Sequence, residues 1–137
     1  MPVPVIVCPA RNPRAARIVA GLLAQESDLQ VTLCHACAPR HVGSDGPNEV
    51  VILTAGLPDM RDVSQLESAL RLHPWTPVIV LSMYEDPVVT RHLLAHGAAA
   101  FLALDQAVNR LPRLIRQLSG PSRSQLALHR VRAHAAP

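Results

Sequence analysis

Five short aliphatic runs, separated by helix-forming stretches or turns, constrain the fold of this protein more than any other feature. The runs cover Val3–Val7, Leu29–Ala36, Glu49–Leu53, Pro77–Leu81 and Ala99–Ala103. Glu49–Leu53 and Pro77–Leu81 are nearly continuous in Val, Ile and Leu and do not alternate with polar residues. Such runs are typical of strands that are buried on both faces of a parallel sheet. We therefore expect a layered α/β domain.

The stretches after the first and third runs carry helix signals. Asn12 followed by Pro13 is typical of an N-cap and the first helical position, and an apolar stripe then continues to about Gln25. Asp62 can cap a second helix, which Pro74 would end.

Two further helices are expected in the second half of the chain. Asp86 opens a helix that Gly97 closes. The last helix begins near Gln106 or Asn109, and Pro112 must lie in its first turn or kink it. Its apolar face is expected to comprise Val108, Leu111, Ile115 and Leu118.

Parallel strands joined by right-handed crossovers leave few topologies for such a chain. The flavodoxin-like, doubly wound strand order 2-1-3-4-5 suits a domain of 137 residues. Sites in sheets of this kind lie at the carboxyl ends of the strands. Those ends carry Pro9–Arg11, Thr54, Ser82 and Leu104.

Charge is unevenly distributed along the chain. Lysine is absent, which excludes a P-loop lysine and a Schiff-base lysine. Arginines and acids balance up to residue 118, whereas residues 119–137 hold arginines and no acid, so the formal charge is +3. We expect a folded domain over residues 1–118 and a basic, flexible tail over residues 119–137. A neutral domain with a short basic tail argues against nucleic-acid binding through this chain alone.

The cysteine content and the N-terminus bear on the compartment. The chain has three cysteines, Cys8, Cys34 and Cys37, and its N-terminus does not read as an export signal. An odd number of cysteines without such a signal favours reduced thiols in the cytoplasm. No run approaches the ~20 apolar residues of a membrane-spanning helix, so we expect no membrane association.

Two groups of residues could suggest a metal site on composition alone. The segment 34–37 (CHAC) with His41 contains the ligand types of zinc, but successive residues of a strand point to opposite faces, so the ligands would diverge. His92 and His96 lie four residues apart on a predicted helix, where exposed histidines are common. We predict no metal site and no cofactor.

Three spans, EVVILTAGLPDM, PVIVLSMYEDP and AHGAAAFLALD, stand in the order and spacing found in receiver domains of bacterial response regulators. On these spans, and on NPRAARIVAGLL, residues 4–118 resemble a CheY-like receiver of the NarL/FixJ/LuxR-type group. The resemblance implies the same five-stranded, doubly wound α/β sheet. It also implies that the family's second helix is shortened or absent, because residues 37–48 are too few for that helix and its loops.

The resemblance identifies what this chain lacks. In the family, an acidic pair after the first strand binds Mg²⁺, an aspartate after the third accepts phosphate, and a lysine after the fifth pairs with the phosphate. The matching positions hold Ala10 and Arg11 (or Pro9 and Ala10), Thr54 and Leu104. We therefore expect an atypical, pseudo-receiver domain with no catalytic residue and a degenerate phosphorylation pocket made of Ala10, Arg11, Thr54, Ser82 and Leu104.

Two residues of this pocket leave alternatives open. Thr54 is either a phosphosite for a serine/threonine kinase or a small polar residue that fills the pocket. Arg11 either binds an anion or forms a salt bridge with Asp59, Glu85 or Asp105, which are all expected near the same edge.

Other family features are retained. Ser82 matches the hydroxyl residue that senses the phosphate, and Phe101 matches the aromatic residue that reports this state. The family's docking faces would correspond to two sets, Arg14, Ile18, Leu111 and Ile115, and His92, Ala100 and Arg110.

These features together imply a phosphorylation-independent protein–protein interaction module in bacterial signal transduction or transcription regulation, and not an enzyme. The expected partner is a response regulator, a sensor kinase or a second copy of the chain in a homodimer. Two alternatives are the receiver part of an atypical DNA-binding response regulator and a small-molecule-sensing pseudo-receiver.

Overall fold

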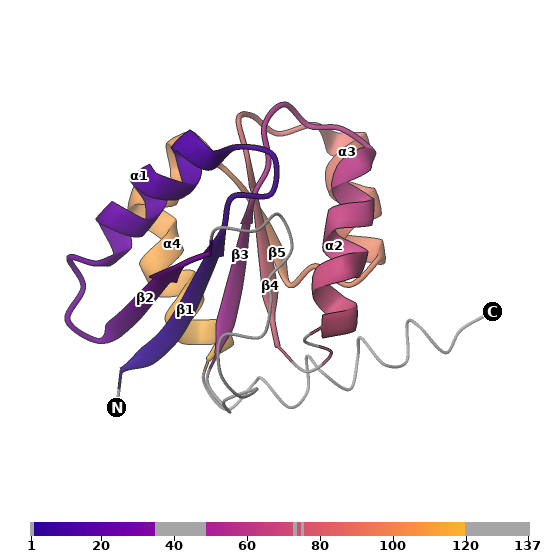
Figure 1. The fold of residues 1–137 in the computed structure, drawn as a ribbon. Helices are drawn as coiled ribbons and strands as arrows, with labels where there is room; N and C mark the ends of the chain where they lie inside the picture. Colours follow the sequence, from indigo (N-terminus) through magenta and orange to yellow (C-terminus); the bar gives the residue numbers. More distant parts are fainter. Residues whose placement is uncertain (1, 35–48, 73, 75, 120–137) are drawn as a thin grey trace.

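The computed structural model describes residues 2–34, 49–72, 74 and 76–119. These residues form a five-stranded parallel sheet in the order β2-β1-β3-β4-β5, together with four helices (Figure 1). The elements along the chain are β1 (Val3–Cys8), α1 (Pro13–Leu23), β2 (Leu29–Leu33), β3 (Val50–Thr54), α2 (Arg61–Leu72), β4 (Val78–Ser82), α3 (Pro87–Ala95), β5 (Ala100–Ala103) and α4 (Leu104–Leu118). The expected doubly wound fold and strand order are confirmed.

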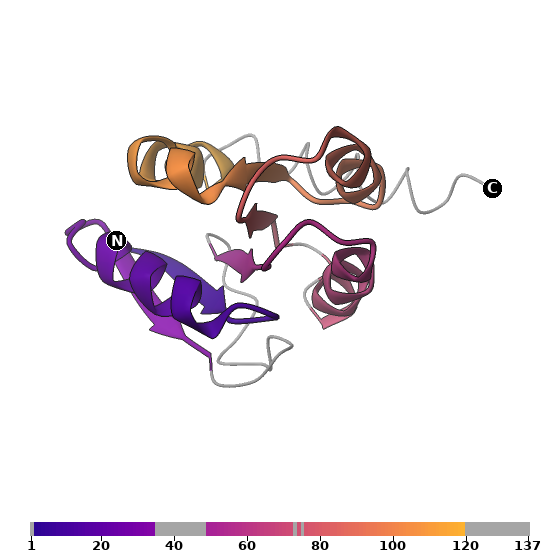
Figure 2. The ribbon, with the colours of Figure 1, turned by 90° about the horizontal axis from the view of Figure 1, so that it is seen from above.

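Helices cover both faces of the sheet. Viewed from above, α1 and α4 lie on one side of the strands, and α2 and α3 lie on the other (Figure 2). Because successive residues of a strand point to opposite faces, β1 contributes to two separate apolar clusters. Val5 and Val7 pack under α1 and α4, whereas Ile6 and Cys8 pack on the side of α2 and α3.

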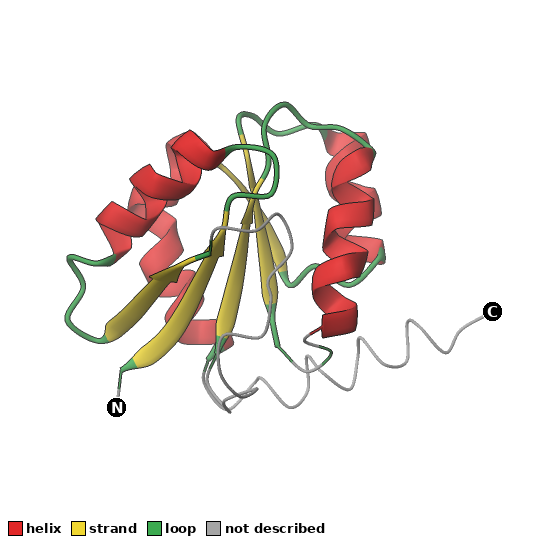
Figure 3. Cartoon of the chain, in the orientation of Figure 1, coloured by secondary structure: helices red, strands yellow, loops and turns green. Residues whose placement is uncertain are grey.

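The central strands are buried along their whole length. Every residue of β3 and of β4 is buried, as their continuous aliphatic composition predicts. In contrast, β2 lies at one edge of the sheet and alternates between more buried and exposed residues. The sheet is therefore a rigid central layer whose strands all point toward the same set of loops, at the top of Figure 3.

Two of the predicted helix starts are confirmed. The Asn12 side chain accepts a hydrogen bond from the Ala15 N–H, and Pro13 begins α1. The Asp86 side chain accepts hydrogen bonds from the Val88 and Val89 N–H groups at the start of α3. Each cap satisfies amide groups that the first helical turn leaves unpaired.

The predicted start of the last helix is wrong. Helix α4 begins at Leu104, directly after β5, and Pro112 lies inside it. No connecting loop separates the two elements, so the helix begins two residues before Gln106 and five before Asn109, where no capping pattern indicates a start. Val108 is 58% exposed and does not belong to the buried face of α4.

Several sequence predictions lie outside the described residues. The fate of the family's second helix depends on residues 35–48, and the basic tail covers residues beyond Ser119. His35, Cys37 and His41 of the candidate zinc set are likewise not described. Within the described part of the chain, none of the helices has the length and apolarity that a bilayer crossing requires.

Candidate functional site

The carboxyl ends of β1, β3 and β4 meet at one edge of the sheet, where sites of this fold class lie. Three loops converge there, those joining β1 to α1, β3 to α2 and β4 to α3 (Figure 1). The predicted pocket residues Ala10, Arg11, Thr54 and Ser82 belong to these strand ends and loops. We call this region the carboxyl edge.

The loop after β1 makes a tight turn. The Asn12 N–H donates to the Pro9 carbonyl oxygen at 2.6 Å. Ala10 has a backbone φ of 41°, in the left-handed region that residues other than glycine seldom adopt. The turn directs the next residue back toward β3, where the Arg11 N–H donates to the Thr54 carbonyl oxygen at 3.3 Å.

Thr54 occupies the end of β3 and is fully buried. Its hydroxyl lies 2.9 Å from the Cys8 carbonyl oxygen and 3.2 Å from the Asn12 carbonyl oxygen. A hydroxyl has one hydrogen to donate, so both acceptors compete for it. Both acceptors belong to the protein's own backbone, which favours the interpretation of Thr54 as a polar residue that fills the pocket.

Arg11 forms a salt bridge, one of the two alternatives that the sequence leaves open for it. Its guanidinium lies 3.7 Å from the carboxylate of Asp59, one of the three acids expected near it. It also lies 3.4 Å from the carboxylate of Asp62, which was expected to cap the second helix. The Asp62 side chain is only 3% exposed. An arginine thus compensates a buried acid at the edge where the family binds a metal cation.

Asp62 is not the cap of α2, because the helix begins one residue earlier, at Arg61. The Asp62 carboxylate instead accepts a hydrogen bond from the Asp59 N–H at 3.1 Å. The Arg61 N–H donates to the Asp59 side chain at 2.9 Å, so Asp59 satisfies an amide at the start of the helix. The spacing of two acids three residues apart at a helix start was the signal for this arrangement.

The two carboxyl groups have opposite pKa shifts. Burial raises the pKa of Asp62, although the Asp59 N–H and the Arg11 guanidinium oppose this effect. The Arg61 N–H and the Arg61 side chain lower the pKa of Asp59, which also lies near Arg11. The more exposed acid is therefore the more readily ionised, and the buried one depends on Arg11.

Ser82 closes the loop between β3 and α2. Its hydroxyl donates to the Gly56 carbonyl oxygen at 2.7 Å, and the Met83 N–H donates to the same oxygen at 3.0 Å. The Asn12 amide, whose role here the sequence did not indicate, donates to the Ala55 carbonyl oxygen at 3.4 Å. Backbone carbonyls thus accept from the polar side chains at this edge.

Leu104 and Phe101 do not join this group. Leu104 begins α4 and packs against the cluster under α1 and α4. Phe101 is partly buried and packs against the cluster on the side of α2 and α3. The expectation that Leu104 helps to form the pocket is therefore wrong, because its apolar side chain is used in the core.

The described residues of the carboxyl edge do not form a cluster of three or more metal-ligating side chains. Elsewhere among the described residues, too, no group of three or more His, Cys, Asp or Glu side chains is arranged to hold a metal ion. His92 and His96 interact instead within their helix, where the His96 Nδ1 lies 2.7 Å from the His92 carbonyl oxygen.

Among the described residues, clefts open on other parts of the surface. One of about 160 Å³ lies between α1 and α4. One of about 270 Å³ is lined by β5 and α4. The third, of about 540 Å³, lies near the end of α2 and includes His96. None of the three is lined by Arg11, Thr54 or Ser82.

The predicted docking residues divide by exposure. Arg14, Ile18, His92 and Arg110 are exposed, and Ala100 is partly buried. Leu111 and Ile115 are only 2% and 0% exposed. Their assignment to a docking face is wrong, because α4 is amphipathic and turns these residues toward the sheet.

Comparisons with known proteins bear on the fold. No protein-family model matches the chain, and no curated protein matches its sequence. The response regulator RcsB from Salmonella typhimurium matches with a TM-score of 0.62 and 16% identity, over 92% of this chain and 67% of RcsB. The signal receiver domain of NarL from Mycobacterium tuberculosis matches with a TM-score of 0.57 and 17% identity, over 86% of this chain and 96% of that domain.

The chain has the CheY-like receiver fold. A third receiver-fold structure, a response regulator from Burkholderia pseudomallei, matches with a TM-score of 0.56 and 18% identity, over 94% of this chain and 75% of that one. It was determined with a phosphorylated aspartic acid and a calcium ion. In the present receiver fold, the strand β3 ends at Thr54, and Asp59 and Asp62 are paired with Arg11. A shared fold does not fix function, so the function must be argued from this edge.

Proposed function

We propose that this chain is a phosphorylation-independent protein–protein interaction module of bacterial signal transduction or transcription regulation, and that it is not an enzyme. The observation that carries the proposal is the state of Thr54. Its hydroxyl is buried and bonded to the Cys8 and Asn12 carbonyl oxygens, at the strand end where a phosphorylated receiver would need an exposed carboxylate.

The charge of the carboxyl edge supports the same proposal. Phosphoryl transfer at a carboxylate needs a divalent cation held by acidic oxygens. Two acids near this edge, Asp59 and Asp62, already lie against the Arg11 guanidinium. A second cation placed beside Arg11 would meet like-charge repulsion.

The helices supply surfaces for a partner. Ile18 on α1 is 58% exposed, and Arg14 lies one turn away on the same side of that helix. On α3, Val88 is 60% exposed and His92 lies one turn away. The core of a protein interface is more apolar than its polar rim, so these exposed aliphatic side chains with polar neighbours mark the two candidate docking faces.

The thiols fit a reducing compartment. Cys8 and Cys34, the two cysteines in the described residues, are both free. Because disulfides are rare in the cytosol, we propose that the module acts in the cytoplasm, where a response regulator or a sensor kinase offers its cytoplasmic domains as a partner.

Affinity capture with paired variants tests the proposal. The purified chain would be immobilised and exposed to native cytoplasmic extract without any phosphodonor, and the captured proteins identified by mass spectrometry. We expect a response regulator, a sensor kinase or a second copy of the chain to be retained. Ile18→Glu and Val88→Glu change side chains of nearly equal exposure, 58% and 60%, on opposite sides of the sheet.

The two variants distinguish the docking faces. We expect one of them to weaken retention about tenfold or more, since a charge at the centre of an interface is costly, while the other retains the partner. Leu57→Glu, at a 63% exposed loop position, is the control for added charge. Retention that requires a phosphodonor, or that both helix variants leave unchanged, would contradict the proposal.

A further inference from the structure

Cys8 and Cys34 lie side by side at the ends of two neighbouring strands. The parallel register pairs Val7 with Leu33, so the next rung pairs Cys8 with Cys34. The Cys34 N–H donates to the Val7 carbonyl oxygen at 2.9 Å, which holds the two chain segments in this register. Both side chains point to the same face of the sheet and belong to one buried cluster.

This placement suits a covalent bond between the two sulfur atoms. Adjacent strands are about 4.8 Å apart, and disulfides join residues whose Cα atoms are about 4.4–6.8 Å apart. Both sulfur atoms lie in the same buried cluster, on neighbouring strands at matching positions of the register. Little backbone movement is therefore needed to join them.

We propose that Cys8 and Cys34 form a peroxide-sensitive dithiol, a modification site at which oxidation produces a disulfide between β1 and the end of β2. The site is independent of the docking function proposed above. The oxidant class is hydrogen peroxide, which is small enough to approach a nearly buried sulfur atom.

The chemistry proceeds in two steps. The Cys34 sulfur, as thiolate, attacks one peroxide oxygen; the O–O bond breaks, Cys34 becomes a sulfenic acid, and hydroxide leaves and takes up the proton that Cys34 released. The Cys8 sulfur then attacks the Cys34 sulfur; the S–O bond breaks, and hydroxide leaves as water with the proton of Cys8. Two thiols lose two electrons and two protons, and one peroxide becomes two waters.

Cys34 is the residue that reacts first. It retains 8% exposure, whereas Cys8 has none. The interaction with the Cys8 thiol lowers the pKa of Cys34, against desolvation and the nearby Glu49 carboxylate, which raise it. The same interaction, together with burial, raises the pKa of Cys8. Because the thiolate is the nucleophile, the roles of attacking and resolving thiol follow from this asymmetry.

The bond would form directly behind the carboxyl edge. The Cys8 carbonyl oxygen accepts the Thr54 hydroxyl hydrogen bond, and the loop that carries Ala10 and Arg11 begins at the next residue. A disulfide would fasten the start of this loop to the end of β2. Oxidation would thus limit movement where three loops meet.

Peptide mapping tests the proposal on the native full-length chain. The protein would be treated with hydrogen peroxide, quenched with catalase, then denatured and alkylated with N-ethylmaleimide. Cleavage after arginine yields peptide 1–11, with Cys8, and peptide 18–40, with Cys34 and Cys37. We expect these two peptides to be joined, to separate on reduction, and the intact chain to take up one alkyl group where the reduced chain takes up three.

A Cys37→Ser variant identifies the partner of Cys8, because Cys34 is then the only cysteine in peptide 18–40. We expect this variant to lose about 2 Da on oxidation, the mass of two hydrogen atoms. In a Cys8→Ala, Cys37→Ser variant, verified as folded by circular dichroism, we expect Cys34 to proceed to sulfinic acid. A parent chain that keeps three free thiols, or a Cys37→Ser variant in which Cys34 is overoxidised while Cys8 stays reduced, would overturn the proposal.

Discussion

The carboxyl edge of the sheet and the outer faces of the helices use their side chains in opposite ways. At the edge, Thr54, Ser82 and Arg11 direct their polar atoms to carbonyl and carboxylate oxygens of the protein itself. On the helices, apolar residues such as Ile18, Val88 and Val108 remain more than half exposed. The polar groups of the edge thus have internal partners, whereas exposed apolar side chains occur on the helix faces and also in the edge loops, at Leu57, Met83 and Tyr84.

Substitutions in the two regions should therefore affect different properties, the stability of the fold at the edge and partner binding on the helix faces. A substitution at the edge should destabilise the fold, because it removes internal bonds or leaves a buried group without its partner. A substitution at an exposed helix position should leave the fold intact and affect contacts with another protein. Matched substitutions in buried and exposed positions test whether only the edge substitutions destabilise the fold.

The largest effect is expected for Thr54→Asp. The substitution places a carboxylate at a fully buried position opposite the Cys8 and Asn12 carbonyl oxygens, which cannot donate a hydrogen bond to it. We expect a loss of about 3 kcal/mol or more in the free energy of unfolding, measured by urea denaturation. An aspartate introduced alone at this strand end should therefore damage the domain.

The matched control is Thr32→Asp, the same substitution at an exposed position of the edge strand β2. We expect it to cost about 1 kcal/mol or less. If Thr54→Asp were as mild as Thr32→Asp, the pocket at the end of β3 would be open and the contrast between the two regions would fail.

A smaller loss is expected for Arg11→Met. It removes the guanidinium beside Asp62, whose side chain is 3% exposed. Because Arg11 is partly exposed, solvent screens the pair, and we expect a loss of about 1–3 kcal/mol near neutral pH. Urea denaturation across a pH series measures it.

The loss of stability in Arg11→Met should become smaller as the pH falls. Burial already raises the pKa of Asp62, so ionising this acid costs stability as the pH rises. Without Arg11 the cost is larger, and the deficit of the variant should shrink as the pH falls and Asp62 is protonated. Adding Asp62→Asn should recover part of the loss at neutral pH, and a deficit that is independent of pH would contradict the assigned pairing.

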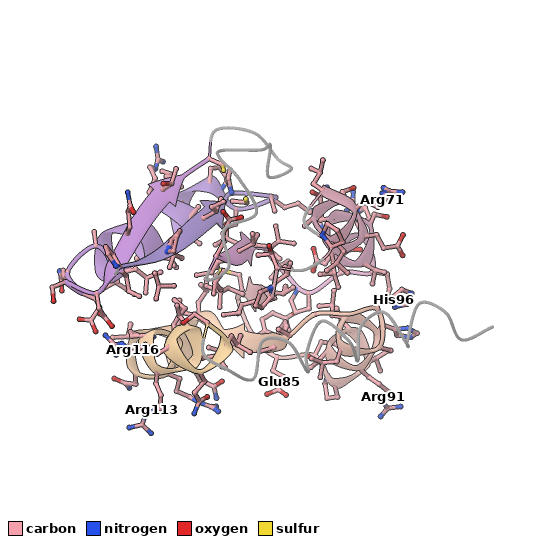
Figure 4. The ribbon with its side chains drawn as sticks, turned by 90° about the horizontal axis from the view of Figure 1, so that it is seen from below. Arg71, Glu85, Arg91, His96, Arg113 and Arg116 are labelled. Atoms are coloured by element: carbon pink, nitrogen blue, oxygen red, sulfur yellow. The ribbon has the colours of Figure 1, made fainter. Side chains whose placement is uncertain are left out.

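The smallest effect is expected for Arg116→Met, at the surface. Arg116 on α4 donates to Asp28 at 2.7 Å and to Glu26 at 2.9 Å, and all three side chains are substantially exposed. We expect a slight lowering of Tm that disappears in high salt. Arg113→Met is the control, since this side chain projects away from the body of the protein (Figure 4).

The stabilisation by Arg116 should depend on pH in the acidic range, because its partner Asp28 is protonated there. Arg116 lowers the pKa of Asp28 below its ordinary 3.8. The stabilisation is therefore present above pH 3.8 and is lost as the pH falls through the lower value in the folded protein. A difference between Arg116→Met and the parent that persists in strong acid would show that packing, and not charge, is responsible.

The sequence predicted the scaffold well because local patterns determine it. Continuous aliphatic runs identified the buried strands, and Asn12 and Asp86 identified two helix starts. The start of α4 was missed because no capping residue separates it from β5. The resemblance marked Leu111 and Ile115 as surface residues, although the periodicity of α4 assigns them to its buried face.

The site was predictable only in part. The carboxyl edge and Thr54 followed from the strand ends, and local charge made Asp59 one of three candidate partners for Arg11. The role of Asp62 could not be predicted without knowing that α2 begins one residue earlier, at Arg61. Cys8 and Cys34 are 26 residues apart in the sequence, and their proximity could be predicted only from the register of β1 and β2. Interactions between distant segments depend on this three-dimensional register and leave no local periodicity.

The most direct test of the central claim is incubation of the purified chain with acetyl phosphate and Mg²⁺, followed by intact-mass measurement. We predict an unchanged mass and the same retention of the captured partner with and without the phosphodonor, because the edge offers a buried hydroxyl and an arginine where phosphate transfer needs carboxylates. A stoichiometric gain of about 80 Da, the mass of one phosphoryl group, accompanied by a change in partner binding, would contradict a phosphorylation-independent module.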